Sequence, residues 1–390
     1  MTVVDMRNFF TDCKVKLIEI SDTKIYYAEE KTEEGHDSLF LLEYDRVTQT
    51  ERIVANYILS NAAYQRHYFA FEDEIIMVME KGENLAWILR IDKHTGAEKN
   101  LAQIYFIGNL EDCKALDSSH ILFYTTANQE HQKLFAEYEK LTGFPQIAYL
   151  YDLTTETYHY VKDSRICNVA SSQILSYEKE GESWLMVLQP YGTEIEKELY
   201  YHSRDSVGGE IYDQVWTCSL EHFFQGVEAG EELEMTLLFC ADTNGLVRYA
   251  GMDGDNLYFR AKYFPNEDQR ICAINKNTWE KDVAVMLNLQ ENEAEANFLI
   301  DTTNGQVYRV REQEDEIEIK GVLNSKVRGK YTRELGDFIA CVEDRFLIAR
   351  YIMSDDRDSF EFNSIFDVET HQQQSYESRC AVRNNTVVLY

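Results

Sequence analysis

The sequence predicts an all-β protein assembled from one repeated unit of four strands. The unit is clearest in IAYLYDLTTETYHYV, residues 147–161, which alternates like a strand, breaks at Asp152 to Thr155, and alternates again. Strand side chains point alternately to opposite faces, and an Asp carboxylate can accept hydrogen bonds from backbone N–H groups just downstream. The stretch therefore predicts a β-hairpin with a tight D-x-x-T turn. The 26 Tyr and 20 Phe of the chain suit many short, half-buried strands.

The D-x-x-T turn recurs along the chain in the same phase. Clear copies pair a side-chain acceptor with a Thr three residues later: Asp45 with Thr48, Asp92 with Thr95, Asn275 with Thr278, and Asp367 with Thr370. A weaker copy has Ser219 and His222 at these positions, and a still weaker one falls within residues 306–321. A second type of hairpin, with an acidic or Asn/Ser turn, precedes most copies, as in VKLIEISDTKIYYAEE and YFAFEDEIIMVMEK. One repeat is therefore four strands.

The spacing of the repeat predicts a β-propeller. The turns follow one another at intervals of roughly 50 to 70 residues, which fits four-stranded blades lengthened by insertions. A sandwich or barrel would explain the alternation but not the constant phase of the turns. The last segment, CAVRNNTVVLY (380–390), repeats only the first hairpin of a unit, so we expect it to pair with an N-terminal strand and close the ring. We expect seven four-stranded blades, or eight if residues 1–10 contribute a strand to a separate closing blade.

The whole chain, 1–390, is expected to be a single propeller domain with two insertions, because it has only 3 Pro and no Ser/Gly-rich linker. The insertion at about 127–146 predicts a helix that Asn128 caps and that Gly143 and Pro145 end. Its apolar face would comprise Leu134, Phe135, Tyr138 and Leu141. The helix would either cover core or act as a lid or docking helix.

The second insertion, at about 190–235, is the least regular part of the chain. Polar and aromatic side chains gather there around Gly208 and Gly209: His202, Arg204, Asp205, Tyr212, Asp213 and Trp216. Such a mixture can form a binding loop, or the segment can simply link extra strands within an enlarged blade.

Charge and cysteine content narrow the partners and the compartment. The net charge of −31 argues against nucleic acid and against a membrane surface, so we expect a neutral or basic protein or small-molecule partner and a monomer. The basic run SKVRGKYTRE, with Lys326, Arg328, Lys330 and Arg333, is interpreted as a solvated loop between blades. The 8 Cys form no C-x-x-C pair and are expected to be reduced, and no signal peptide is recognisable, which together predict a cytoplasmic protein.

Linear motifs for catalysis are not found in the sequence. The 9 His form no H-E-x-x-H or i, i+4 pair, and there is no G-x-S-x-G elbow and no Gly-rich phosphate loop. Asp253 and Asp255 in GMDGDN lack the further ligands of a calcium loop, and the acidic run 354–359 is read as a solvated loop. We therefore assign no catalytic residue, no metal ligand and no cofactor, and the binding residues stay unknown.

The two ends of the expected blades are not equivalent. The D-x-x-T turns are short and uniform, whereas the links between hairpins vary in length, at 31–38, 127–146, 263–269 and 354–360. Binding residues concentrate in loops that a rigid scaffold positions. The long-link face is therefore the expected place of any site.

The repeats resemble the β-propeller superfamily, and within it uncharacterised bacterial multi-bladed propellers. The chain has no repeated W-D dipeptide and no repeated double glycine, so it does not resemble WD40 or kelch proteins. The resemblance implies a non-enzymatic interaction or ligand-binding role, and carries over no functional residue. The alternative is a carbohydrate-active hydrolase or lyase with its site at the mouth of the central channel. Clustered His, Arg and carboxylate side chains at that mouth would favour the enzyme.

Overall fold

The computed structural model describes most of the chain, which forms two compact units. The described residues are 1–10, 14–33, 36–59, 65–82, 84–167, 173–190, 213–240, 245–252, 255–263, 268–285, 297–301, 306–312, 316–321, 327–332, 337–343, 345–354 and 359–390. The larger unit is Lys16–Val247, and the terminal unit combines Met1–Val15 with Arg248–Tyr390.

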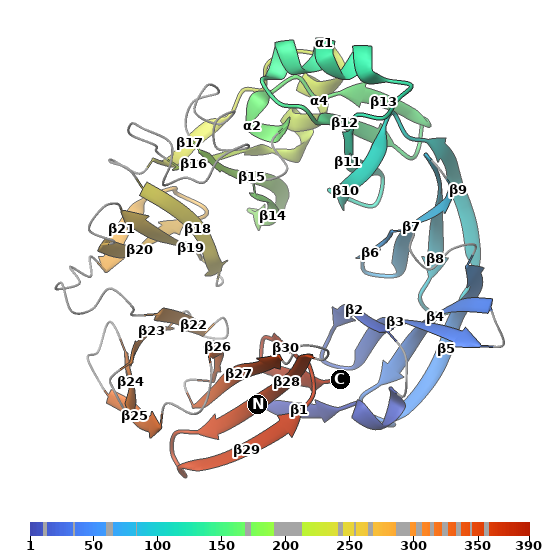
Figure 1. Cartoon of the computed structure of the whole chain (residues 1–390). Coiled ribbons are helices and arrows are strands. Elements are labelled where there is room, and N and C mark those ends of the chain that lie inside the picture. The colour runs from blue at the N-terminus through green and yellow to red at the C-terminus, as the bar shows by residue number, and fades with distance from the viewer. Residues whose placement is uncertain are drawn as a thin grey trace. The chain divides into compact units, whose positions relative to one another are not determined.

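Four antiparallel sheets of four strands each belong mainly to the larger unit, as far as the described residues show (Figure 1). The first two sheets are β2(Lys14–Ile20), β3(Lys24–Glu33), β4(His36–Asp45) and β5(Thr50–Leu59), then β6(Arg66–Ala70), β7(Glu74–Gly82), β8(Leu85–Asp92) and β9(Glu98–Tyr105). The next two are β10(Asn109–Ala115), β11(His120–Thr126), β12(Ile147–Asp152) and β13(Thr157–Tyr160), then β14(Gln173–Lys179), β15(Glu182–Pro190), β16(Asp213–Ser219) and β17(Thr236–Cys240).

The terminal unit contains three further four-stranded sheets and one three-stranded sheet within its described residues. The four-stranded sheets are β18(Gly245–Met252), β19(Asn256–Tyr263), β20(Asp268–Asn275) and β21(Lys281–Val285), then β22(Asn297–Asp301), β23(Gln306–Glu312), β24(Glu316–Gly321) and β25(Val327–Thr332), then β26(Asp337–Val342), β27(Phe346–Ser354), β28(Ser359–Asp367) and β29(Gln372–Glu377). The three-stranded sheet has the order β1(Thr2–Asp5), β31(Thr386–Leu389) and β30(Cys380–Arg383).

The predicted repeat is confirmed, because every four-stranded sheet has its strands in sequence order. The predicted pairing of the two ends of the chain is also confirmed: β1 runs parallel to β31, with Thr2 opposite Thr386 and Asp5 opposite Leu389. The strand from residues 1–10 thus belongs to a separate sheet, together with β30 and β31, as the eight-blade alternative supposed. How many of these sheets are blades of one ring stays a prediction.

The D-x-x-T turns have the geometry that the sequence predicts. The Asp92 carboxylate accepts hydrogen bonds from the backbone N–H groups of His94 (2.9 Å) and Thr95 (2.7 Å). Equivalent bonds form at the other clear copies: Asp45, Asp152, Asn275 and Asp367. Each turn joins the third and fourth strands of its sheet. The ends of the sheets that carry these turns and the turns between first and second strands are called the turn ends, and the opposite ends are called the link ends.

Three predicted segments differ in the structure. Ser219 does not start a turn: its hydroxyl accepts the backbone N–H of His222 as the N-cap of helix α4(Leu220–Ala229). Residues 306–321 contain β23 and β24, which are the second and third strands of their sheet and so lie one strand earlier than predicted. Most of the basic run is β25 rather than a loop, since Val327–Thr332 pairs with β24; Lys326 and Arg333 lie outside the described residues.

The predicted helix in the first insertion is present as α1(Gln132–Thr142), and Gly143 ends it with a φ of 88°. Its buried side chains Phe135 and Tyr138 join the core of the larger unit, so the helix covers core. Leu141 is exposed, contrary to the prediction. Asn128 accepts the backbone N–H of His131 at 3.0 Å, and so caps the turn before the helix rather than the helix itself.

The remaining short elements are α2(Ser164–Cys167) and the 3-10 helix η1(Arg7–Phe9). The largest apolar core of the larger unit lies among β7, β8 and the sheets β10–β13 and β14–β17, where Phe223 and Val227 of α4 also pack. A second core lies between the first two sheets. Cys113 and Cys218 are buried free thiols, and Cys380 is a half-buried one. None of the described helices has the length and apolar character needed to cross a membrane.

Candidate ligand-binding site

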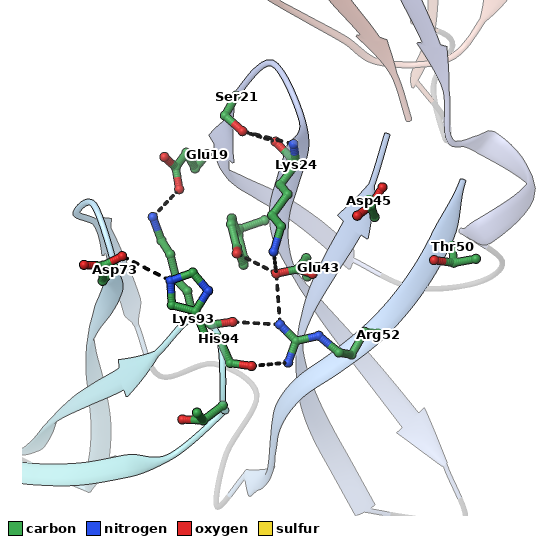
Figure 2. A network of polar contacts seen from close by, with 12 residues as sticks. Glu19, Ser21, Lys24, Glu43, Asp45, Thr50, Arg52, Asp73, Lys93 and His94 are labelled. Carbon is green, nitrogen blue, oxygen red and sulfur yellow. Dashed lines mark hydrogen bonds and ion pairs between the residues drawn. The ribbon is translucent and has the colours of Figure 1, made fainter. Parts of the chain in front are cut away.

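Charged side chains form a dense network at the turn ends of the first two sheets (Figure 2). Its centre is Lys93, which lies in the D-x-x-T turn after β8 and is buried. The Lys93 ammonium donates to a Glu19 carboxylate oxygen at 2.5 Å and to the backbone carbonyls of Phe71 and Glu72. An ammonium has three N–H donors, so this lysine is fully satisfied within the protein.

Arg52 and Glu43 complete this turn-end network. The Arg52 guanidinium donates to the carbonyl oxygens of Lys93 (2.7 Å) and His94 (3.1 Å) and to the Glu43 carboxylate (2.9 Å). Burial acts to raise the pKa of Glu43, but hydrogen bonds from Tyr26, Lys24 and Arg52 outweigh it and hold that pKa below its usual value. Because its central groups face one another, we interpret the network as a clamp between two sheets and not as a ligand site.

A different arrangement occurs on the first strands, towards their link ends. Lys16 of β2, His67 of β6 and Asp112 of β10 come from three successive sheets, and we call these three residues the first-strand cluster. The first strands lie on one side of the row of sheets in the larger unit, and β6 and β10 are neighbours (Figure 1). The four-strand repeat thus places one residue from each of these three sheets in the same region.

The polar groups of the first-strand cluster are near one another but not mutually satisfied. His67 Nδ1 lies 3.9 Å from an Asp112 carboxylate oxygen, which is too far for a hydrogen bond. The Lys16 ammonium lies 3.3 Å from the Arg66 carbonyl oxygen and 5.5 Å from the centre of the Tyr68 ring. No described carboxylate forms an ion pair with Lys16, whose side chain is exposed.

Electrostatics keep His67 neutral. Burial lowers the pKa of His67. The Asp112 charge raises that pKa by a smaller amount, and the Lys16 charge lowers it by a still smaller amount. The charge of the first-strand cluster is therefore positive on β2 and negative on β10, with an uncharged imidazole between them near neutral pH.

Ordered contacts hold β6 in place beside the cluster. Arg66 is buried and donates to the Glu30 carboxylate at 2.9 Å, which ties β6 to the link end of β3. The backbone N–H of Gln65 donates to the Glu80 carboxylate at 2.7 Å, and the Gln65 amide oxygen lies 3.3 Å from His67 Nε2. The His67 ring is thus positioned by Gln65, whose backbone is held in turn by Glu80 of β7.

Few of the positions singled out in the sequence contribute to this region. In the 190–235 insertion His202, Arg204, Asp205 and Tyr212 lie outside the described residues, as does Asp253. Asp213 is buried at the start of β16, where its carboxylate accepts the Val247 backbone N–H at 2.6 Å. Among the described residues, no group of three or more His, Cys, Asp or Glu side chains could hold a metal ion.

The first-strand cluster was missed because its members are far apart in the sequence. Lys16, His67 and Asp112 have no linear motif in common. Their shared signal is position: each lies in the first strand of its four-strand unit. Aligning the four-strand repeats strand by strand would have placed all three residues in the same, first strand.

Comparisons with known proteins concern the fold. No protein-family model matches the chain, and no curated protein matches it. Among solved structures, the propeller domain of the Trilobed protease from Pyrococcus furiosus is similar at 10% identity and a TM-score of 0.44, over 94% of this chain and 95% of that one. An uncharacterised protein of Listeria monocytogenes is similar at 11% identity and a TM-score of 0.44, over 96% of both chains.

A prolyl endopeptidase is similar at 10% identity and a TM-score of 0.49, over 94% of this chain but 50% of its own length. This chain therefore spans about half of that enzyme. The serial four-stranded antiparallel sheets, each with its strands in sequence order, are the arrangement of propeller blades. The chain has a β-propeller fold.

Proposed function

We propose that this propeller is a ligand-binding protein without a catalytic reaction, and that its ligand binds at the first-strand cluster. The observation that carries the proposal is the contrast between the two charged regions. The turn-end network satisfies its buried charges internally, through Lys93 and Arg52. In the first-strand cluster, Lys16 is exposed and His67 stands beyond hydrogen-bond distance from Asp112. Polar groups that converge without satisfying one another are available to a ligand.

The location also agrees with the expected division of the blades. Lys16 and His67 lie in the link-end halves of their strands and Asp112 in the middle of β10, so the cluster adjoins the ends where the sequence predicts a binding face. The buried free thiols of Cys113 and Cys218 support a reducing compartment, so we propose a cytoplasmic protein.

A carbohydrate-active hydrolase or lyase at the same place is the second candidate. One observation favours it: a neutral His67 beside Asp112 is a pair that acid–base chemistry can use. The enzyme candidate predicts that a bound compound is converted to product, whereas the binding proposal predicts only that the compound saturates the site.

A thermal-shift screen tests the proposed function. Purified protein is melted with amino acids, sugars, organic acids and nucleosides at millimolar concentration, and the triple variant Lys16→Met, His67→Gln, Asp112→Asn is melted in parallel. We expect compounds that raise the Tm of the natural chain but not of the triple variant. Compounds that stabilise both chains equally would place the binding elsewhere. Consumption of a stabilising compound, followed by NMR, would favour the enzyme.

A further inference from the structure

The order of charges in the first-strand cluster indicates the chemistry of its ligand. Lys16 places a positive charge on β2, and Lys14 on the same strand is also exposed. Asp112 places a negative charge on β10, beside the exposed Glu111. His67, on the strand between them, is near enough to Lys16 and Asp112 for both charges to change its pKa. The region is therefore dipolar and not uniformly basic or acidic.

We propose that the first-strand cluster binds a small zwitterion, an amino acid or short peptide, with its carboxylate at Lys16 and its ammonium group at Asp112. This inference rests on the proposed function and names the ligand class of the same site. Opposite charges at the two ends of one ligand match the opposite charges on β2 and β10. A free cation or a free anion would satisfy one end and be repelled at the other.

Each end of the site has capacity for a further bond. Among the described residues, the Lys16 ammonium makes one long hydrogen bond, to the Arg66 carbonyl, and its two other N–H groups can donate to a ligand carboxylate. One Asp112 oxygen accepts the Cys113 backbone N–H at 2.8 Å, which fixes the carboxylate and leaves acceptor positions for an ammonium group. Lys114 lies on the same strand and interacts electrostatically with Asp112. Its positive charge acts against the ammonium group of a ligand but does not occupy that group's place at Asp112.

The net charge of the protein favours a neutral ligand as well. At −31, the chain repels anions over long range, and this repulsion would weaken binding of a simple organic acid. A zwitterion has no net charge and therefore escapes this repulsion. Its two ends still gain from the local charges of Lys16 and Asp112.

Isothermal titration with triglycine, triglycine amide and N-acetyl-triglycine tests the inference. We expect triglycine to bind at least tenfold more tightly than either blocked peptide, because each blocked peptide lacks one charge. In Lys16→Met the preference for triglycine over triglycine amide should disappear. In Asp112→Asn the preference for triglycine over N-acetyl-triglycine should disappear. Each variant thus removes one preference and keeps the other.

Two variants serve as controls with the same change of charge. Lys133→Met alters an exposed lysine of α1 and Asp22→Asn an exposed aspartate of the β2–β3 turn, and both should keep both preferences. Melting curves establish that every variant is folded. Equal binding of the three peptides, or no binding of triglycine, would overturn the inference. If other compounds in the thermal-shift screen still depend on the cluster, the proposed function survives that failure.

Discussion

The acceptor residue of each D-x-x-T turn holds two backbone N–H groups that would otherwise lack partners. At Asp152 the carboxylate accepts the backbone N–H of Thr154 (2.7 Å) and the Thr155 hydroxyl (2.7 Å). We expect Asp152→Ala to lower the free energy of unfolding by about 0.5–2 kcal/mol, as similar capping changes do. Chemical denaturation measures this loss. Ligand binding should not change, and a binding defect without loss of stability would contradict the separation of turn ends from the binding site.

His120 predicts a pH dependence. Its ring stacks on Phe224 of α4 at 3.9 Å between centres, and its Nδ1 lies 3.0 Å from the Asp117 carboxylate. Burial acts to lower the pKa of His120, but Asp117 outweighs it, with smaller effects of Asp152 and Glu228, so the pKa is raised above 6.5. The interaction of His120 with Asp117 therefore stabilises the folded protein fully below pH 6.5, the ordinary pKa of histidine. This stabilisation is lost as pH rises through the raised pKa of the folded state.

The measurement compares the natural chain with His120→Gln. The difference in free energy of unfolding between them should be larger at pH 6 than at pH 8. The reverse trend would mean that the ring is held neutral against Phe224.

Between neighbouring elements, the D-x-x-T turn of the second sheet lies against an irregular position of the first sheet. The residue after each D-x-x-T sequence has a positive φ: Gln49, Gly96, Glu156, Trp279 and His371. Gly96 also lies against β5 at the place where the pairing of β4 and β5 shifts around Val54. Similar register shifts occur in the outermost strands β9, β17, β21 and β25, and such bulges blunt exposed sheet edges.

A pair of glycine variants tests that contact. A Cβ at Gly96 would lie 2.3 Å from the Val54 carbonyl oxygen, whereas a Cβ at Gly181 would meet nothing within 4 Å. Both residues have positive φ, so Ala costs about 1–2 kcal/mol at either place. We expect Gly96→Ala to lower the Tm clearly more than Gly181→Ala. Equal losses would show that the turn does not press on β5.

At the scale of strands, turns and helices, part of the structure was predictable from the sequence. Hairpins and D-x-x-T turns were predictable because their signals lie within a few residues. The prediction at Ser219 was wrong because a helix N-cap and a D-x-x-T turn use the same hydrogen bond, which the side chain accepts from the backbone N–H three residues later. The residues that follow Ser219 favour a helix. The first-strand cluster was not predictable from local patterns, because only the stacking of three units brings Lys16, His67 and Asp112 together.

For the molecule as a whole, net charge limits the partners. With −31 charges, binding to DNA or RNA should be negligible near physiological salt, since that binding depends on cations that displace counterions from phosphates. We expect no shift of either nucleic acid in a gel at micromolar protein. Tight, salt-sensitive binding would reveal a basic surface that outweighs the global charge, and Arg328 and Lys330 of β25 would be the first residues to change.

Closure of one ring by both ends of the chain is the expectation on which the whole architecture depends. β31 lies between β1 and β30, and its Val387, Val388 and Leu389 side chains are fully buried. Calorimetry of the full chain and of a chain ending at Arg379 tests closure most directly. We predict one cooperative transition for the full chain, and a lower Tm with a tendency to aggregate for the shortened chain, because β1 loses its partner and exposes an edge. Two separate transitions in the full chain, or an unchanged Tm in a monomeric shortened chain, would contradict a single closed propeller.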